Sequence, residues 1–177
     1  MKIYISIITL LFSLFLGAQN LEKYEEMPEV DGVFITQNMF ELLAKVDIES
    51  NNPEEKDFIE LIKNLKGIKV LTTTNLEVGS QMKTDVESYL SSENLEELMR
   101  IKQQGKFVKF YSKPGSTAEK ISQLFMFMTD EEKSEKRFVI LSIIGNIDLK
   151  EIGNMAGELE GIPGAEELKN INDEKNK

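Results

Sequence analysis

The chain contains neither histidine nor cysteine, and these two absences limit the chemistry that its side chains can perform. Histidine is the side chain best matched to proton transfer near neutral pH, and it is the usual base for a serine or cysteine nucleophile. Without both residues, thiol catalysis, histidine–cysteine zinc sites, haem attachment and iron–sulfur clusters are excluded. The chemistry that remains belongs to carboxylates, hydroxyls, lysines and tyrosines.

Paired carboxylates are the signature of glycoside hydrolysis, and the chain has two candidate groups. They are Glu96 with Glu97, and the run Asp130-Glu131-Glu132. One acid of a catalytic pair needs an apolar pocket that raises its pKa, whereas both groups lie in charge-rich sequence that is typical of a solvated face. No serine–lysine spacing and no calcium-binding loop matches its pattern either. We therefore predict no catalytic residues, no metal site and no cofactor.

A different set of residues points to binding. In the apolar run at 106–111, Phe107, Lys109 and Tyr111 alternate with their neighbours, so they share one face of a strand. Phe125 and Phe127 alternate in the same way in the next apolar run. If this face of the sheet is free of helices, the five residues form an exposed surface for a protein or an apolar ligand. The other interpretation is that a helix or the N-terminal segment covers them.

The elements that position these residues follow from hydrophobic periodicity. Apolar, β-branched runs predict strands at 32–36, 68–75, 106–111, 121–128 and 137–144. Amphipathic spacing predicts helices after Asn38 and over 53–65, 81–101 and 148–159. Short, turn-rich or charged connections between the last strands favour an antiparallel meander. The predicted fold class is α+β, with a mostly antiparallel sheet of about five strands, a C-terminal three-stranded meander, and helices packed mainly on one face.

The run at 137–144 is apolar on both faces, and this predicts a central strand. Gly145 and Asn146 are predicted to turn the chain out of this strand, because both residue types favour turns. Asp148 and Glu151 then form a capping box for the last helix.

The N-terminus has the pattern of a secretory signal peptide. Lys2 precedes an uncharged apolar run at 3–16, which Gly17 and Ala18 follow, and the run is shorter than the roughly 20 residues of a membrane-spanning helix. We expect cleavage after Ala18, export to the periplasm or the extracellular space, and no transmembrane segment in the mature chain. The expected layout is a signal peptide at 1–18, a polar lead-in segment at 19–30, a single α+β domain at 31–171 and a disordered tail at 172–177.

Charge and cysteine content narrow the class of partner and the compartment. The net charge of −10 argues against nucleic acid as a partner, because nucleic acid requires a basic footprint. An exported domain without disulfides suits a bacterial periplasm or cell surface better than a eukaryotic extracellular space.

One stretch near the C-terminus resembles a known family. An apolar strand ends in Gly145, and Ile147-Asp148-Leu149 and a helix that starts with Lys150-Glu151-Ile152 follow it. Together with the leader, the meander and the missing catalytic set, this stretch resembles the small exported proteins of Bacteroidetes-type bacteria grouped as domain of unknown function 4252 (DUF4252). The resemblance covers nearly the whole chain after the leader. It implies export and a compact α+β domain, and it supplies no catalytic residue; some members are lipid-anchored, and this chain departs from them because it has no cysteine.

The sequence therefore predicts an exported, non-catalytic binding or interaction module of the bacterial cell envelope, with a protein or an apolar ligand as its partner. Two alternatives stay open. One is a carboxylate-dependent hydrolase acting on cell-wall sugars or peptides, and the other is a structural component of the envelope.

Overall fold

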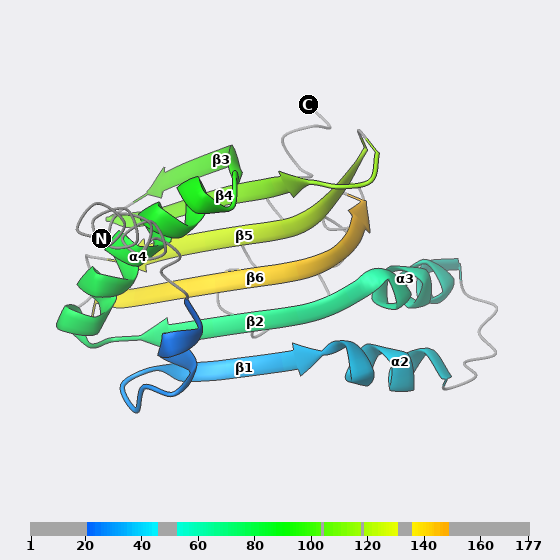
Figure 1. The fold of residues 1–177 in the computed structure, drawn as a ribbon, viewed down its shortest axis with the longest axis horizontal. Coiled ribbons are helices and arrows are strands. Elements are labelled where there is room, and N and C mark those ends of the chain that lie inside the picture. Colours follow the sequence, from blue (N-terminus) through cyan, green and yellow to red (C-terminus); the bar gives the residue numbers. More distant parts are fainter. Residues whose placement is uncertain (1–20, 46–52, 104, 118, 131–135, 149–177) are drawn as a thin grey trace, which may run out of the picture.

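In the computed structural model, six antiparallel strands form one sheet within the described part of the chain, which comprises residues 21–45, 53–103, 105–117, 119–130 and 136–148. Their spatial order is β1-β2-β6-β5-β4-β3 (Figure 1). The strands are β1 (Asp31–Thr36), β2 (Leu65–Thr73), β3 (Glu96–Gln103), β4 (Lys106–Pro114), β5 (Lys120–Asp130) and β6 (Arg137–Asp148). The predicted signal peptide, the predicted helix after Asp148 and the predicted tail lie outside the described residues.

The described helices lie along the chain between these strands. They are the short 3₁₀-helix η2 (Leu21–Glu25) and the α-helices α2 (Gln37–Lys45), α3 (Pro53–Asn64) and α4 (Leu76–Ser92). The α+β class and the C-terminal antiparallel meander, β4–β5–β6, are confirmed. The sheet has six strands where about five were predicted, because β3 adds an edge strand beside β4.

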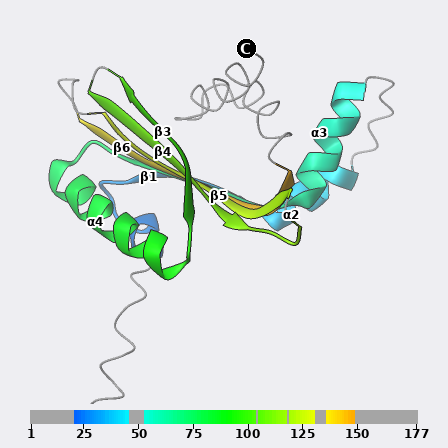
Figure 2. The same cartoon turned by 90° about the horizontal axis from the view of Figure 1, so that it is seen from above.

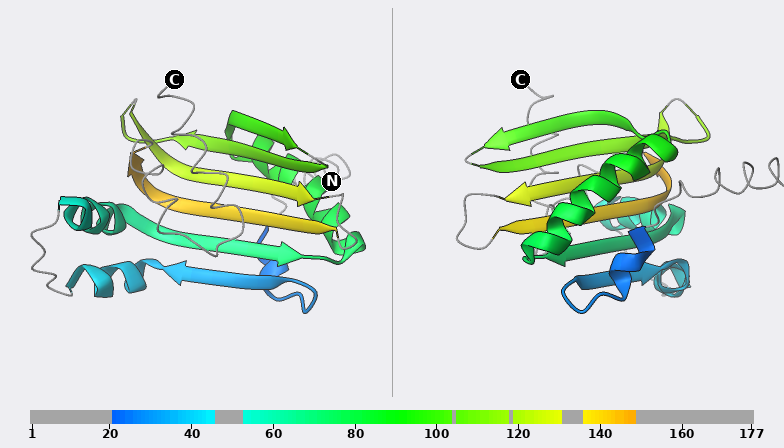
Figure 3. Two further views of the ribbon diagram at one scale, coloured as in Figure 1. Left: turned by 180° about the vertical axis from the view of Figure 1, so that it is seen from behind. Right: turned by 60° about the vertical axis from the view of Figure 1, so that its left-hand side comes forward.

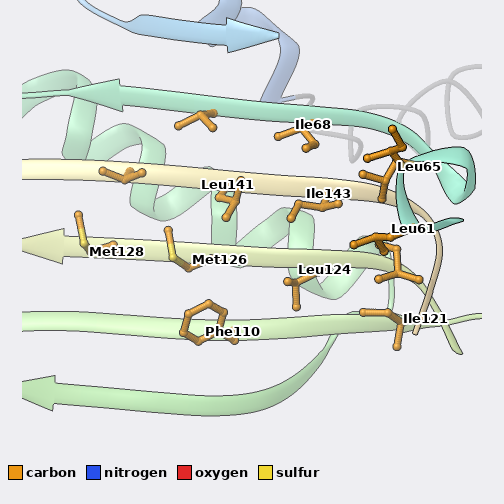
Figure 4. Packing of buried hydrophobic residues seen from close by; sticks show 14 of the residues in the cluster. Leu61, Leu65, Ile68, Phe110, Ile121, Leu124, Met126, Met128, Leu141 and Ile143 are labelled. Carbon is orange, nitrogen blue, oxygen red and sulfur yellow. The ribbon is translucent and has the colours of Figure 1, made fainter. Parts of the chain in front are cut away.

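β6 is a central strand, as its sequence predicted, and it separates two apolar clusters. Val139 and Leu141 point to one face of the sheet, and Phe138 and Ile140 point to the other. The first face carries a cluster whose members come from neighbouring strands and from the α2–α3 end of the sheet (Figure 4). Phe110, Met126 and Leu141 in this cluster have no exposed surface.

The helices occupy both faces of the sheet, so the prediction that they pack mainly on one face was wrong. Phe40 of α2 and Leu61 of α3 belong to the first cluster, whereas Met82 and Val86 of α4 belong to the cluster on the opposite face. Figure 2 shows α4 on one side of the sheet and α3 rising from its far end on the other side. The physical reason is that the central strands are apolar on both faces, and each face has to be covered.

The segment predicted as a helix over 81–101 is a helix followed by a strand. α4 begins earlier than predicted, at Leu76, because the side chain of Asn75 accepts hydrogen bonds from two free backbone amides of the first turn. It ends at Ser92, and Asn94 then adopts the left-handed conformation with φ = 54°, which asparagine tolerates better than most residues. The chain reverses there and continues as β3.

Gly145 and Asn146 do not form the predicted turn, because both lie inside β6. Gly145 pairs with Leu65 of β2, where the strand meets the end of α3. A Cβ atom at Gly145 would lie 2.5 Å from the backbone oxygen of Asn64. Glycine is therefore required here by the close approach of two backbones and not by a turn. Asp148, predicted to cap a helix, is the last residue of β6 and pairs with Lys120.

Residues of the predicted lead-in segment pack on the same face as α4. Leu21 and Tyr24 of η2 are buried in the cluster beneath that helix. The Tyr24 hydroxyl donates a 2.5 Å hydrogen bond to the buried carboxylate of Asp85 in α4, and Lys23 forms a 2.5 Å ion pair with the same group. Thr73 donates a further 2.6 Å hydrogen bond to the carbonyl of Glu29. The N-terminal segment from residue 21 is therefore fixed to both α4 and β2.

Candidate functional site

A groove of about 630 Å³ lies between α4 and the β3–β5 end of the sheet. α4 crosses this face obliquely, from the end of β2 toward β3 (Figure 3). We call this cleft the α4–β3 groove; its volume lies within the usual range of small-molecule sites.

Aromatic side chains form the floor of the α4–β3 groove, and α4 supplies its apolar wall. Phe107 and Tyr111 come from β4 and Phe127 from β5, while Val86 and Leu90 come from α4. Phe107 is 36% exposed, and Tyr111 and Phe127 are each 8% exposed. The floor is therefore an apolar surface that remains open at Phe107.

The polar rim of the groove is mainly cationic. Lys83 of α4, Arg100 and Lys102 of β3, and Lys109 of β4 line it, against the carboxylate of Glu87. This charge pattern contrasts with the whole chain, in which 31 acidic residues outnumber 21 basic ones.

The spacing of these residues explains why they meet. Lys83, Glu87 and Leu90 recur at helical intervals, so they share one stripe of α4. Across the sheet, Lys109 is the register partner of both Arg100 in β3 and Phe127 in β5. Directly opposed side chains on one face lie about 5 Å apart at Cβ. Two cations and an aromatic ring therefore form one row across the groove.

Two of the four cations contact a neighbouring side chain, Arg100 as an ion pair and Lys102 as a cation–π contact that leaves its charge in place. The Nε atom of Arg100 lies 2.5 Å from a carboxylate oxygen of Glu97, and Lys102 lies over the ring of Phe107, with Nζ 5.0 Å from the ring centroid. Lys83 and Lys109, by contrast, form no ion pair with any residue that the structure describes.

Tyr111 keeps its proton over the whole physiological range. Burial raises the pKa of its phenol, and the nearby charge of Glu97 raises it further, although Arg100 opposes this effect. The neutral hydroxyl therefore stays a hydrogen-bond donor at the end of the aromatic floor.

A second cleft of about 720 Å³ lies on the same face and crosses the sheet from β1 to β4, beside the C-terminal end of α4. Phe34 and Ile144, which are 44% and 46% exposed, line it. Within it, the Gln123 amide donates 2.9 Å hydrogen bonds to the hydroxyls of Tyr89 and Ser142. We call it the Phe34 cleft.

Four of the five residues predicted as a binding surface line the α4–β3 groove, namely Phe107, Lys109, Tyr111 and Phe127. Phe125 does not: it is buried, packs against Tyr111 with ring centroids 6.5 Å apart, and borders the Phe34 cleft instead. Of the two interpretations that the sequence left open, the helix-covered face describes the structure better, because α4 covers part of the face that carries these residues. Whether the remaining groove binds a ligand stays a prediction.

The candidate acids are not placed as a catalytic pair among the described residues. Glu97 is engaged by Arg100 on the edge strand. Asp130 is 8% exposed, so the prediction of a solvated face was wrong for this residue; its register partners are Lys106 in β4 and Arg137 in β6. Glu131 and Glu132 lie outside the described residues. Within the described ranges, no cluster of acidic side chains is placed to hold a metal ion.

Sequence reasoning missed the residues of the groove that lie outside the β4–β5 pair. Arg100 was assigned to the helix over 81–101 and Lys102 to no element, although the alternation of Met99 and Ile101 with these charges is the period of a strand. The α4 residues Lys83 and Glu87 lie on a stripe next to the buried Met82 and Val86, and this placement offered a weaker signal.

The fold and the site define a small α+β sheet protein with a cationic, aromatic groove, and the chain belongs to a known family. Its residues 24–155 match the model of the domain of unknown function DUF4252, which confirms the resemblance. No curated protein and no solved structure matches the chain. Of the helices in the described ranges, none has the length and apolar character that crossing a bilayer requires.

Proposed function

We propose that this chain is an exported, non-catalytic binding module of the bacterial cell envelope, and that the α4–β3 groove is its ligand surface. The observation that carries this proposal is the groove itself: an apolar aromatic floor next to cations that the described part of the protein leaves uncompensated. Export is supported by the leader-like pattern at 1–18.

The composition of the groove favours binding over paired-carboxylate hydrolysis. A hydrolase of that kind needs two acids on opposite sides of the scissile bond, and the lining of the groove offers Glu87 as its carboxylate. Aromatic side chains, by contrast, supply large contact areas at a small cost in conformational entropy. The floor of Phe107, Tyr111 and Phe127 is suited to hold an apolar group.

Titration of the purified protein with the neutral apolar fluorophore N-phenyl-1-naphthylamine tests the proposal. We expect saturable binding in the wild type and about fivefold weaker binding in Phe107→Ala, because truncation of an aromatic anchor costs about 1 kcal/mol or more. Phe34→Ala, a matched truncation in the Phe34 cleft, is the control and should bind as the wild type does.

Two results would contradict the proposal. One is the absence of saturable binding by a wild-type protein whose circular dichroism shows it to be folded. The other is a loss of binding in Phe34→Ala with none in Phe107→Ala. Strong self-association in sedimentation experiments, together with no probe binding, would instead favour the structural role.

A further inference from the structure

From the charges around the groove we infer the class of its ligand: an amphiphile with a single anionic head, of the fatty-acid type, whose apolar chain lies on the aromatic floor and whose head is held by Lys83 and Lys109. This inference rests on the proposed function, because it names the ligand of the same groove. It depends on where the uncompensated cations lie relative to the apolar surface.

Lys109 gives the stronger argument for an anionic ligand, because it is less exposed than Lys83. It is half-buried, and on its face of the sheet it lies between Arg100 and Phe127. Glu97 offsets the charge of Arg100, so the cost at this position comes from the ammonium group of Lys109, which is partly desolvated and has no counter-ion among the described residues. An anion bound in the groove supplies that counter-ion.

Ion pairing differs among the cations of the described residues. Glu93 lies 2.7 Å from Lys113, and Glu25 pairs with Lys69, whereas Lys63 and Lys66 form no ion pair with another described residue. Lys83 and Lys109 differ from these exposed lysines because both line the groove that holds the aromatic floor. In the groove, Lys83 and Lys109 have no such partner among the described residues, which leaves two ammonium groups for an external anion.

The apolar part of the groove indicates that the rest of the ligand is a hydrocarbon chain. Phe107 and Phe127 come from adjacent strands, and Val86 and Leu90 face them from α4. A compact inorganic anion would leave these surfaces in water. A hydrocarbon chain covers them, and each methylene group that it buries contributes about fourfold in affinity.

Displacement of the neutral fluorophore by a matched series of compounds tests the inference. The series is dodecanoate, dodecanol and dodecyltrimethylammonium, each below its micelle-forming concentration. We expect dodecanoate to bind about tenfold more tightly than dodecanol and the cation to bind most weakly, since a hydrogen bond to a charged group contributes about one power of ten or more. Lengthening the acid from ten to twelve carbons should tighten binding, and raising the salt to about 1 M should weaken it.

Substitutions locate the head group. Lys109→Met and Lys83→Met keep the length of the side chain and remove its charge, so each should weaken dodecanoate binding about tenfold while leaving the neutral fluorophore unaffected. Lys63→Met, on the exposed face of α3, is the matched control and should have no effect.

The outcomes separate this inference from the proposed function. Equal displacement by dodecanoate and dodecyltrimethylammonium, or unchanged dodecanoate binding in both lysine variants, overturns the anionic-amphiphile assignment while the groove remains a binding site. Tighter competition by an acidic peptide such as oligoglutamate than by dodecanoate overturns it in favour of a protein partner. If the neutral fluorophore does not bind, the result contradicts the proposed function itself, that the groove is a ligand surface.

Discussion

The hydrogen bond between Tyr24 and Asp85 holds the N-terminal segment on α4, and Tyr24→Phe removes it with little change in shape. Tyr24 has no exposed surface and Asp85 is 3% exposed, so the bond is shielded from solvent. A hydrogen bond to a charged group contributes about 1.5–3 kcal/mol, against about 0.5–1.5 kcal/mol for a neutral pair. We expect Tyr24→Phe to lower the free energy of unfolding by about 2 kcal/mol, measured by urea denaturation.

Tyr89→Phe is the matched control for this substitution. Tyr89 loses the same hydroxyl, but its partner is the neutral amide of Gln123 at 2.9 Å, so its loss should be near 1 kcal/mol. Combining Tyr24→Phe with Asp85→Asn isolates the pairwise coupling, because the double variant should lose less than the sum of the two single losses. The reasoning is refuted if Tyr24→Phe costs no more than Tyr89→Phe, or if the two losses simply add.

Further predictions concern alkaline pH, helix packing and helix capping. Burial, the hydrogen bond to Asp85 and the negative charge of Asp85 raise the pKa of Tyr24 above 10, so the unfolded chain loses this proton at a lower pH than the folded protein does. The free energy of unfolding should therefore fall above pH 10, by up to about 1.4 kcal/mol per pH unit for this group. The fall should be less steep in Tyr24→Phe. Gly79→Ala would place a Cβ atom 2.1 Å from the ring of Phe138, so the free energy of unfolding, measured by thermal denaturation, should fall by about 1–3 kcal/mol. The control Ser80→Ala, at an exposed position, should change it by less than about 0.5 kcal/mol. Asn75→Ala should cost about 1 kcal/mol by loss of the N-cap, and Asn75→Asp should retain most of it; equal losses in the two variants would contradict the capping role.

The sequence identified most of the sheet because its strands have strong local signals. β5 and β6 are long apolar runs bounded by turn-forming or charged residues, and β-branched residues mark β2. β3 was not predicted as a strand because its residues include leucine, methionine and glutamate, which favour helices, and because Leu95, Leu98 and Met99 fit helical spacing. In the structure the pairing of β3 with β4 outweighs that local preference, and hydrophobic periodicity in the sequence carries no information about this pairing.

The candidate site was predictable only on the strand side. Alternation in β4 places Phe107, Lys109 and Tyr111 on one face, and this conclusion needs no tertiary information. Which face α4 covers, and that its edge next to Lys83 leaves a groove open, depends on packing across the whole sheet. For the same reason the sequence could not distinguish Phe125, which is fully buried, from Phe107, which is exposed.

Photo-crosslinking tests the central claim, that the α4–β3 groove is the ligand surface, most directly. The wild-type protein would be irradiated with dodecanoate that carries a diazirine on its chain, and the labelled peptides would be mapped by mass spectrometry. The account predicts labels concentrated on α4 around Val86 and on β4 around Phe107, with the signal suppressed by unlabelled dodecanoate. Labels centred on Phe34 and Ile144, or spread evenly over the surface, would contradict it.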